Sequence, residues 1–480
     1  MRYCSTRGQV SDIPFQDAVL MGLARDGGLL LPESFPDVTD RLEAWSKLPY
    51  TDLAFQIMRL FCDDIPDEDL RRIIAKSYER FRPVSETDDA GNADPQIIPV
   101  RDVGPVHLLE LFHGPTYAFK DVALQFLGNL FEYILGKQKS ELNIVVATSG
   151  DTGSAAIHGV RGRKNIRIFV LHPAGRVSPV QEMQMTTVLD PNVFNIALDG
   201  TFDDAQSIVK GLFRDLPFKD ALHLGAVNSI NWARILAQVV YYFHAAFRVM
   251  KRTGAKKVSF SVPTGNFGDI FAGYTAAKMG LPIDKLILAT NENDILSRFF
   301  NTGSYSRSSV VPTLSPSMDI QIASNFERWL FLHAQGDAAQ VRTWMETFAK
   351  TGEIKIEPLP GEDSLDPWLR AGRADTTQTL ATIREFSEAY GYTLDPHSAV
   401  GVSVALAQKT DSPIICLCTA SPAKFPDAVI RAAGEKATVK EPGIEALKGL
   451  PTRKFPLPNE IQKIADFVAE HCHDPASILR

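Results

Sequence analysis

Apolar side chains recur at helical spacing in the first part of the chain. One run consists of Leu53, Ile57, Leu60 and Phe61, and another of Leu70, Ile73 and Ile74. Positions three or four apart lie on one face of an α-helix, so each run predicts a helix. Asp67 stands where it would cap the second helix. We therefore expect residues 1–95 to form a mainly helical N-terminal domain, with an exposed acidic loop at 86–95.

After about residue 140, short β-rich apolar runs alternate with helical patterns. The expected strands are 143–148, 166–171, 194–198, 257–262, 285–289 and 413–418. The expected helices are 151–162, 180–189, 203–216, 231–252 and 270–279. Apolar strands separated by helices are typical of parallel sheets covered by helices, so the pattern predicts the α/β class. Residues 303–316 and 358–366 are expected to be irregular, and the tail from Ile444 to be peripheral helix and coil.

Composition narrows the class of protein and the compartment. Of 480 residues, 45% are hydrophobic and 22% charged, which is ordinary for a soluble globular protein. The net charge of −7, with no basic stripe, argues against a nucleic-acid or membrane-surface partner. The five cysteines fit neither a zinc nor a redox motif, so we expect reduced thiols and no metal. The chain opens with no apolar signal segment, and no stretch is long enough to cross a membrane, so we expect a cytoplasmic protein.

One lysine is a candidate for covalent catalysis. Lys120 ends the run HGPTYAFK (113–120), where a Gly- and Pro-containing loop meets an apolar-periodic helix. Desolvation near a helix N-terminus favours the neutral, nucleophilic form of an amine. A lysine that forms a Schiff base is typical of pyridoxal phosphate (PLP) enzymes. The alternative is a solvated lysine at a helix start, which is the commoner case for any single lysine.

Two turns between a strand and a helix are candidate anion sites. In the first, Gly265, Asn266, Phe267, Gly268 and Asp269 precede the helix expected at 270–279, and backbone N–H groups there could cradle a phosphate. Asp269 is unusual beside a dianion, so we expect it to cap the helix or to receive protons at the rim. A tight turn in which the glycines serve geometry alone is the alternative.

The second turn is dense in hydroxyl and amide groups. It carries Ser149, Asp151 and Thr152, and lacks both the P-loop ending and the dinucleotide glycine pattern. It could hold a carboxylate or a phosphate, or Asp151 and Thr152 could simply cap the helix.

Two further groups are compatible with ligand binding or with structure alone. Asn228, Ser229, Asn231 and Arg234 open the long helix and could converge on a charged substrate group, although Asn231 would also be an ordinary helix cap. Thr419 follows the strand expected at 413–418, at the end of the sheet where α/β proteins bind ligands.

Taken together, these stretches resemble PLP-dependent threonine synthase of the longer bacterial and fungal type. The matching segments, in order, are YCSTRG (3–8), DGGLLLPE (26–33), LFHGPT (111–116), FKD (119–121), ATSGDTGSA (147–155), NSIN (228–231) and PTGNFGD (263–269). The resemblance implies fold type II, with two open twisted α/β domains and the cofactor between them. The expected domains are 1–95, 96–260 with the lysine and the substrate loop, and 261–480 with the cofactor-phosphate loop; these limits are approximate.

The resemblance also implies roles for individual residues. Lys120 would bind PLP covalently and shuttle protons, Gly265 to Asp269 would border the cofactor phosphate, and Thr419 would contact the pyridine nitrogen. Candidates for the substrate carboxylate and phosphate are Ser149, Asp151, Thr152, Asn228, Ser229, Asn231 and Arg234. His113 and Thr116 are weaker candidates near the lysine.

The implied reaction converts O-phospho-L-homoserine and water to L-threonine and phosphate. Elimination at Cγ followed by addition of water at Cβ needs two anion sites, and the two turns offer them. The nearest alternative is another fold type II lyase or dehydratase that releases a keto acid. A non-catalytic PLP-binding or metabolite-sensing protein, and a phosphate- or nucleotide-binding protein without PLP, are more distant alternatives. We expect the substrate O-phospho-L-homoserine to be the only partner, and we expect the enzyme to be a monomer or a homodimer.

Overall fold

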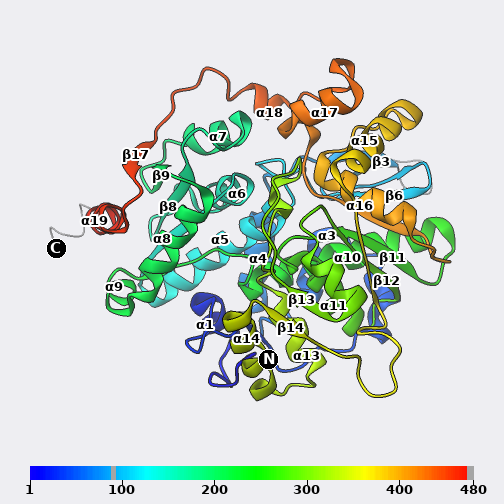
Figure 1. Cartoon of the computed structure of the whole chain (residues 1–480), viewed down its shortest axis with the longest axis horizontal. Coiled ribbons are helices and arrows are strands. Elements are labelled where there is room, and N and C mark those ends of the chain that lie inside the picture. The colour runs from blue at the N-terminus through cyan, green and yellow to red at the C-terminus, as the bar shows by residue number, and fades with distance from the viewer. Residues whose placement is uncertain (88–92, 473–480) are drawn as a thin grey trace. The chain divides into compact units, whose positions relative to one another are not determined.

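The computed structural model describes residues 1–87 and 93–472, and the chain forms two compact units. The first unit comprises residues 1–123 and 229–439, and the second comprises 124–228 and the C-terminal segment from Lys440. Each unit is built around its own sheet, as Figure 1 shows. The three-part division at 95 and 260 expected from the sequence stays a prediction.

The first unit contains a six-stranded sheet with the order β15-β12-β11-β16-β6-β5. Its strands are β5 (Val100–Val103), β6 (Val106–Glu110), β11 (Val258–Pro263), β12 (Ile283–Thr290), β15 (Leu369–Arg373) and β16 (Ile414–Cys418). All neighbours run parallel except β5, which pairs antiparallel with β6. Parallel strands need helical crossovers, and these place their carboxyl ends at one edge, where ligands bind in such sheets.

Helices surround this sheet. They are α10 (Trp232–Thr253), α11 (Gly268–Lys278), α12 (Ile295–Thr302), α13 (Phe326–His333), α14 (Ala338–Thr351), α15 (Thr376–Tyr390), α16 (Pro396–Ala407) and α17 (Pro426–Ala433). Short 3-10 turns lie at η2 (Pro316–Met318), η3 (Pro422–Lys424) and η4 (Glu435–Ala437). The long helix α10, expected at 231–252, is buried along most of its length and packs beside α11, as Figure 1 shows.

The N-terminal region belongs to the first unit and is mainly helical, as expected. Its elements are β1 (Tyr3–Ser5), α1 (Phe15–Met21), β2 (Leu30–Pro32), η1 (Thr39–Arg41), α2 (Leu42–Trp45), α3 (Tyr50–Met58) and α4 (Asp67–Tyr78). The two apolar runs form α3 and α4. Asp67 is the first residue of α4 and not its cap: Pro66 precedes the helix, and no side chain caps it.

Two stretches expected to be irregular contain short strands. β3 (Val84–Thr87) pairs antiparallel with β4 (Ala93–Gln96), so the expected loop at 86–95 is wrong at its two ends, while residues 88–92 lie outside the described part of the chain. β13 (Ser304–Ser306) pairs with β14 (Glu353–Lys355), and the rest of 303–316 is irregular apart from the start of η2. Cross-strand pairing of such short polar segments leaves no periodic apolar signal.

The second unit contains a five-stranded parallel sheet with the order β10-β7-β8-β9-β17. Its strands are β7 (Leu142–Ala147), β8 (Ile166–Pro173), β9 (Val193–Asp199), β10 (Leu224–Gly225) and β17 (Phe455–Pro458). Its helices are α6 (Asp151–Val160), α7 (Pro179–Thr186), α8 (Phe202–Arg214), α9 (Leu216–Ala221), α18 (Pro442–Glu445) and α19 (Ile461–His471). α5 (Lys120–Gln138) begins in the first unit and continues into the second.

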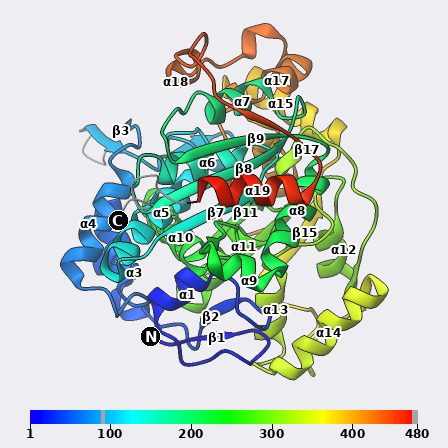
Figure 2. The same ribbon diagram turned by 90° about the vertical axis from the view of Figure 1, so that its left-hand side faces the viewer.

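The C-terminal tail is not peripheral, which corrects the sequence-based expectation. β17 is an edge strand of the second sheet, and Ile464, Ala465 and Val468 of α19 belong to the apolar core of that unit. Figure 2 shows α19 in red, and it packs against α8. Pro456 and Pro458 argue against a strand, but an edge strand tolerates proline because one side of it needs no ladder hydrogen bond.

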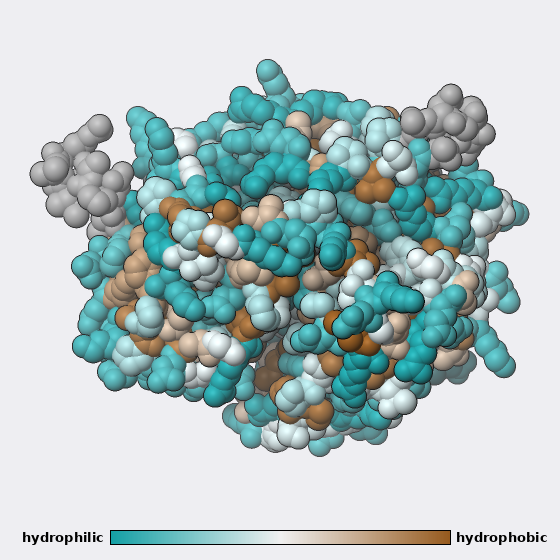
Figure 3. All heavy atoms as spheres, turned by 90° about the horizontal axis from the view of Figure 1, so that it is seen from above, coloured by the Kyte–Doolittle hydropathy of each residue, from teal (hydrophilic) through white to brown (hydrophobic). Residues whose placement is uncertain are grey.

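Within the described residues, no helix is long and apolar enough to cross a membrane. The five cysteines are free thiols, as expected. On the face drawn in Figure 3, hydrophilic residues predominate and hydrophobic residues form small scattered groups.

Candidate active site

The loop that carries Lys120 is fixed by buried hydrogen bonds. The carboxylate of Asp121 accepts from the backbone N–H of Thr116 at 2.7 Å and from its hydroxyl at 2.9 Å. The ammonium of Lys424 donates to the carbonyl of Thr116 at 2.9 Å. A Cβ on Gly114 would stand 2.4 Å from the Cβ of Asp121, so only glycine allows this close approach.

Lys120 is the first residue of α5 and is 8% exposed. Its Nζ lies 3.5 Å from Oγ of Ser317 in η2 and 4.8 Å from the centre of the Phe119 ring. The lysine is therefore held in a partly apolar environment and is not a solvated lysine at a helix start. Of the weaker candidates nearby, His113 pairs with Glu110 at 2.8 Å, and Thr116 is engaged by Asp121.

Thr419 lies beside the lysine loop. Its carbonyl accepts from the N–H of Phe119 at 2.8 Å, and its own N–H donates to Oγ of Ser398 at 3.0 Å. An isolated antiparallel bridge between Ala118 and Ala420 extends this contact. The structure thus brings the lysine and the threonine together from positions about 300 residues apart.

The loop between β11 and α11, the cradle predicted from the sequence, is held in place by close contacts. Phe267 precedes the helix with φ of 63°, a conformation that a non-glycine residue rarely adopts. A Cβ on Gly265 would stand 2.8 Å from the carbonyl oxygen of Ser317. The carbonyl of Asn266 accepts from both the N–H and the side-chain amide of Asn325, each at 3.0 Å. These contacts hold the loop closely against η2 and the start of α13.

Asp269 does not cap α11, which corrects the sequence-based interpretation. It is the second residue of the helix and is buried, not at a rim. Its Oδ1 accepts from the hydroxyl groups of Tyr241 and Tyr242 on α10. Burial raises the pKa of Asp269 to about 6, although both tyrosines and the charge of Lys120 lower it. A buried carboxyl group with a raised pKa therefore stands directly after the cradle.

The start of α10 contains both structural and candidate ligand groups. Asn231 caps the helix by accepting from the N–H of Ala233 at 3.1 Å, and its amide donates to the carbonyl of Val19 at 2.8 Å. Ser229 lies 3.2 Å from Oγ of Ser324. Arg234 is 4% exposed, and burial lowers its pKa to about 10, so it is not the surface arginine of the alternative interpretation.

The remaining candidates belong to the second unit. The N-cap of α6 is Gly150, and Oγ1 of Thr148 accepts from the N–H groups of Gly150 and Gly153 at 2.9 and 2.8 Å. The alternative in which Asp151 and Thr152 cap this helix is therefore wrong. Asp151 instead accepts from Nε2 of Gln181 at 2.8 Å. Ser149 and Thr152 are half-buried, and Asn228 is exposed.

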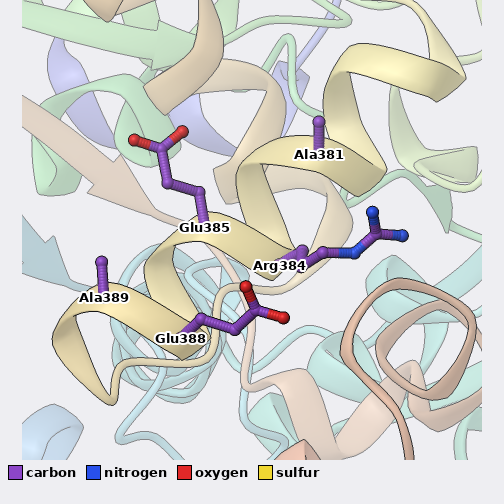
Figure 4. A pocket seen from close by; sticks show the side chains of 5 residues that line it. All are labelled: Ala381, Arg384, Glu385, Glu388 and Ala389. Atoms are coloured by element: carbon purple, nitrogen blue, oxygen red, sulfur yellow. The ribbon is translucent and has the colours of Figure 1, made fainter.

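Several neighbours of the lysine and the cradle could not be found from sequence patterns. They are Ser317, Ser324, Asn325, His397 and Ser398. All lie in turns or helix starts whose local sequence is explained by capping or loop geometry, and only the tertiary fold brings them to the site. A separate surface depression on α15, lined by Ala381, Arg384, Glu385, Glu388 and Ala389, contains none of the candidate residues (Figure 4).

The residues of the first unit fit PLP. PLP has an aldehyde, a phosphate and a pyridine nitrogen. The buried lysine suits the aldehyde, the loop that admits no side chain at Gly265 suits the phosphate, and the threonine at the end of β16 suits the pyridine nitrogen. Three family profiles match the chain: "Threonine synthase N terminus" at residues 2–78, "Pyridoxal-phosphate dependent enzyme" at 101–361, and "Threonine synthase, C-terminal" at 398–468. The chain belongs to the threonine synthase family.

Individual threonine synthases are similar over nearly their whole length. The Saccharomyces cerevisiae protein is 46% identical over 494 residues, covering 96% of this chain and 93% of its own. The Pseudomonas aeruginosa protein is 46% identical over 479 residues, covering 98% of each. The crystal structure of PLP-bound threonine synthase from Brucella melitensis superposes with a TM-score of 0.91 at 45% identity, covering 99% of this chain and 100% of that one.

These comparisons confirm the predicted family, the predicted fold type II and the predicted cofactor, pyridoxal phosphate. The predicted function, threonine synthase, is confirmed at the level of the family.

Proposed function

We propose that this threonine synthase family member converts O-phospho-L-homoserine and water to L-threonine and phosphate, with Lys120 as its catalytic residue. The observation that carries the proposal is the hydrogen bond of 2.8 Å from the N–H of Phe119 to the carbonyl of Thr419. It places the lysine loop next to the threonine expected at the pyridine ring, while Ser317 connects the lysine to the cradle.

PLP, when bound, supplies an electron sink that acidifies carbon atoms next to the amino group of the substrate. Lys120 would hold the cofactor by a covalent bond to Nζ. Once displaced by the substrate amine, its Nζ would accept the proton from Cα and later return one. Its low exposure keeps bulk water from competing for these protons.

The cradle would hold the cofactor phosphate. The backbone N–H groups of Gly265, Asn266, Phe267 and Gly268, together with the N-terminus of α11, would face it. Asp269 borders this group, and burial raises the pKa of its carboxyl group to about 6. Thr419 would hydrogen-bond the pyridine nitrogen without protonating it.

Each unit offers polar residues at a helix start as candidates for an anionic group of the substrate, at α10 in the first unit and at α6 in the second. Elimination removes a proton from Cβ and breaks the C–O bond at Cγ, with the bonding electrons leaving on phosphate, and Cγ then takes up a proton. The oxygen of water bonds to Cβ as water gives up a proton, and Cα regains a proton to give threonine. The candidates for the two anionic ends of the substrate are Ser149, Asp151, Thr152, Asn228, Ser229 and Arg234. Asn231 uses both amide atoms within the fold, so we assign it to shaping the helix start.

Product analysis tests the proposal. The purified chain, supplied with PLP and O-phospho-L-homoserine, should release L-threonine and phosphate in equal amounts. Release of 2-oxobutanoate and ammonia would favour the lyase alternative, and PLP binding without turnover would favour a sensing protein. A cytoplasmic location and a monomeric or homodimeric state stay predictions.

A further inference from the structure

A single buried carboxylate, Asp395, connects to both the lysine and the threonine of the candidate site. Asp395 caps α16 and is 1% exposed. Its Oδ1 accepts from the N–H of His397 at 3.0 Å and lies 2.9 Å from Nδ1 of the same residue. Its Oδ2 accepts from the N–H and the hydroxyl of Ser398. Both oxygens are thus used by two consecutive residues of one helix.

The imidazole of His397 extends this network to a second segment of the chain. The N–H of Ser317, in η2, donates to Nε2 of His397 at 3.2 Å. A nitrogen that accepts carries no hydrogen, so the hydrogen must be on Nδ1, where it is donated to Asp395. The carboxylate therefore fixes the tautomer of the imidazole, and the tautomer allows the bond to Ser317. His397 is 3% exposed, with its ring 5.0 Å from that of Phe425.

Ser317 lies against both Lys120 and the cradle loop at Gly265. Its Oγ lies 3.5 Å from Nζ of Lys120. Its carbonyl oxygen lies 2.8 Å from the position that a Cβ on Gly265 would take. A shift of the Ser317 backbone would therefore move two groups at once. These are the hydroxyl group next to the amine of Lys120 and the carbonyl oxygen next to the cradle.

The other arm of the network ends at Thr419. Oγ of Ser398 donates to Asp395 and accepts from the N–H of Thr419 at 3.0 Å. Since the carbonyl of Thr419 binds Phe119, this arm also returns to the lysine loop. Asp395 is thereby linked, through His397 and Ser398, to the two residues that would contact opposite ends of the cofactor ring.

Helix capping alone does not explain this arrangement. Asp375 caps α15 by accepting from the N–H of Gln378 at 2.8 Å, and its backbone N–H in turn binds the side chain of Gln378. These two hydrogen bonds of the Asp375 cap stay within the first turn of α15. The cap of α16 instead binds, through two side chains, a turn 78 residues upstream and a strand end 24 residues downstream.

We propose that Asp395 and His397 are positioning residues that align Ser317 with Lys120 and, through Ser398, align Thr419. This proposal rests on the proposed function, because it takes Lys120 and Thr419 to be the cofactor contacts. Neither positioning residue exchanges a proton with substrate. Their role is to hold the amine and the ring contact in one geometry, since small misplacements of catalytic groups reduce rates strongly.

The test compares three variants of the full-length enzyme loaded with PLP: Asp395→Asn, His397→Leu and His397→Gln. Asparagine retains a capping oxygen, and glutamine retains an acceptor near the position of Nε2, so both preserve the local fold. Asp375→Asn is the matched control, a helix cap without a connection to the site. The readouts are kcat and KM, the absorbance maximum of the bound cofactor, the fraction of cofactor trapped on Lys120 by borohydride, and the thermal midpoint.

Asp395→Asn and His397→Leu should lower kcat by roughly 10- to 100-fold while KM changes by less than about three-fold. The absorbance maximum and the trapped fraction should change with kcat, and His397→Gln should recover most of both. Asp375→Asn should match the unaltered enzyme in every readout except the thermal midpoint.

Variants with an unchanged spectrum and kcat would overturn the proposal, and so would losses that Asp375→Asn reproduces. If His397→Leu fails to fold, Asp395→Asn and His397→Gln still test the proposal. Glutamine retains the acceptor for the N–H of Ser317, so equal losses of kcat in these two variants would exclude a role for that hydrogen bond. Failure of the unaltered enzyme to trap PLP or to form threonine would instead overturn the proposed function.

Discussion

The hydroxyl of Tyr242 lies 2.9 Å from Oδ1 of Asp269, and this hydrogen bond joins α10 to the first turn of α11 beside the cradle. Tyr241 donates to the same oxygen, and Oδ2 of Asp269 is buried without a hydrogen-bond partner among the described residues. Desolvation outweighs the two tyrosines and Lys120, so that the pKa of this carboxyl rises from 3.8 to about 6. A group with this pKa gives the apoprotein a specific dependence on pH.

Asp269 should destabilise the folded apoprotein increasingly as the pH rises from about 4 to about 6, while buried His244, whose pKa is lowered to about 3, contributes in the opposite direction. In this window the unfolded chain has released the proton of Asp269 while the folded chain still binds it, so deprotonation favours unfolding. A shift of about two units corresponds to roughly 3 kcal/mol at pH 7. Asp269→Asn should remove the contribution of Asp269, so the thermal midpoint of the variant minus that of the unaltered apoprotein should be larger at pH 7 than at pH 4.

Asp121 provides the internal control for this experiment. Burial also raises its pKa to about 6, and it remains in the Asp269→Asn variant. The single variant should therefore lose only part of the pH dependence, and Asp121→Asn should remove another part. Superimposable pH profiles for Asp269→Asn and the unaltered apoprotein would show that Asp269 does not titrate in this range.

Lys120→Ala should abolish turnover without unfolding the chain. Removing the group that would bind the cofactor covalently should lower kcat by roughly a thousand-fold or more. The absorbance of lysine-bound PLP should also disappear, while the thermal midpoint of the apoprotein stays close to that of the unaltered chain. Lys278, an exposed lysine on α11, offers the control Lys278→Ala, which should retain both activity and spectrum. Normal turnover by Lys120→Ala would refute the assignment.

Gly265→Ala should weaken PLP binding more than Gly268→Ala does. The new Cβ at 265 would meet the carbonyl oxygen of Ser317 at 2.8 Å, and backbone cannot move aside cheaply. The new Cβ at 268 would meet the side-chain amide of Asn325 at 3.2 Å, which can shift. Overpacking of this kind costs about 1–3 kcal/mol, so the dissociation constant should rise roughly ten-fold or more for Gly265→Ala. Equal affinities, measured by titration of the two apoproteins with PLP, would contradict this account of the cradle.

The regular elements could be predicted from sequence because their signal is local. The long helix expected at 231–252 is α10 at Trp232–Thr253, and the strand expected at 413–418 is β16 at Ile414–Cys418. The cradle was recognisable for the same reason, since its glycines lie between a strand and a helix. The candidate lysine was recognisable only in combination with those turns.

The residues that sequence analysis missed depend on contacts between distant segments. Ser317 meets Lys120 across 197 positions, and its own sequence context indicates only a loop. The carboxylate of Asp269 was interpreted by its position next to a helix start, whereas its partners come from α10. Local sequence rules predict for a polar residue the role that its sequence neighbours suggest, such as helix capping. They cannot detect a partner that only tertiary packing brings close.

The C-terminal helix α19 should be required for the stability of the second unit. Ile464 is fully buried in a cluster with Ile196, Ile208 and Val468, so Ile464→Ala should cost about 2–5 kcal/mol. Ile461, on the same helix, is 46% exposed, and Ile461→Ala should cost less than about 1 kcal/mol.

The measurement must distinguish the two units. All five tryptophans lie in the first unit, so their fluorescence reports on that unit alone. Hydrogen exchange of the amides of β8 and β9 reports on the second unit, because these strands form the centre of its sheet. Ile464→Ala should accelerate exchange in β8 and β9 while the tryptophan signal stays unchanged. Exchange as slow as in the unaltered chain would mean that the tail is peripheral after all.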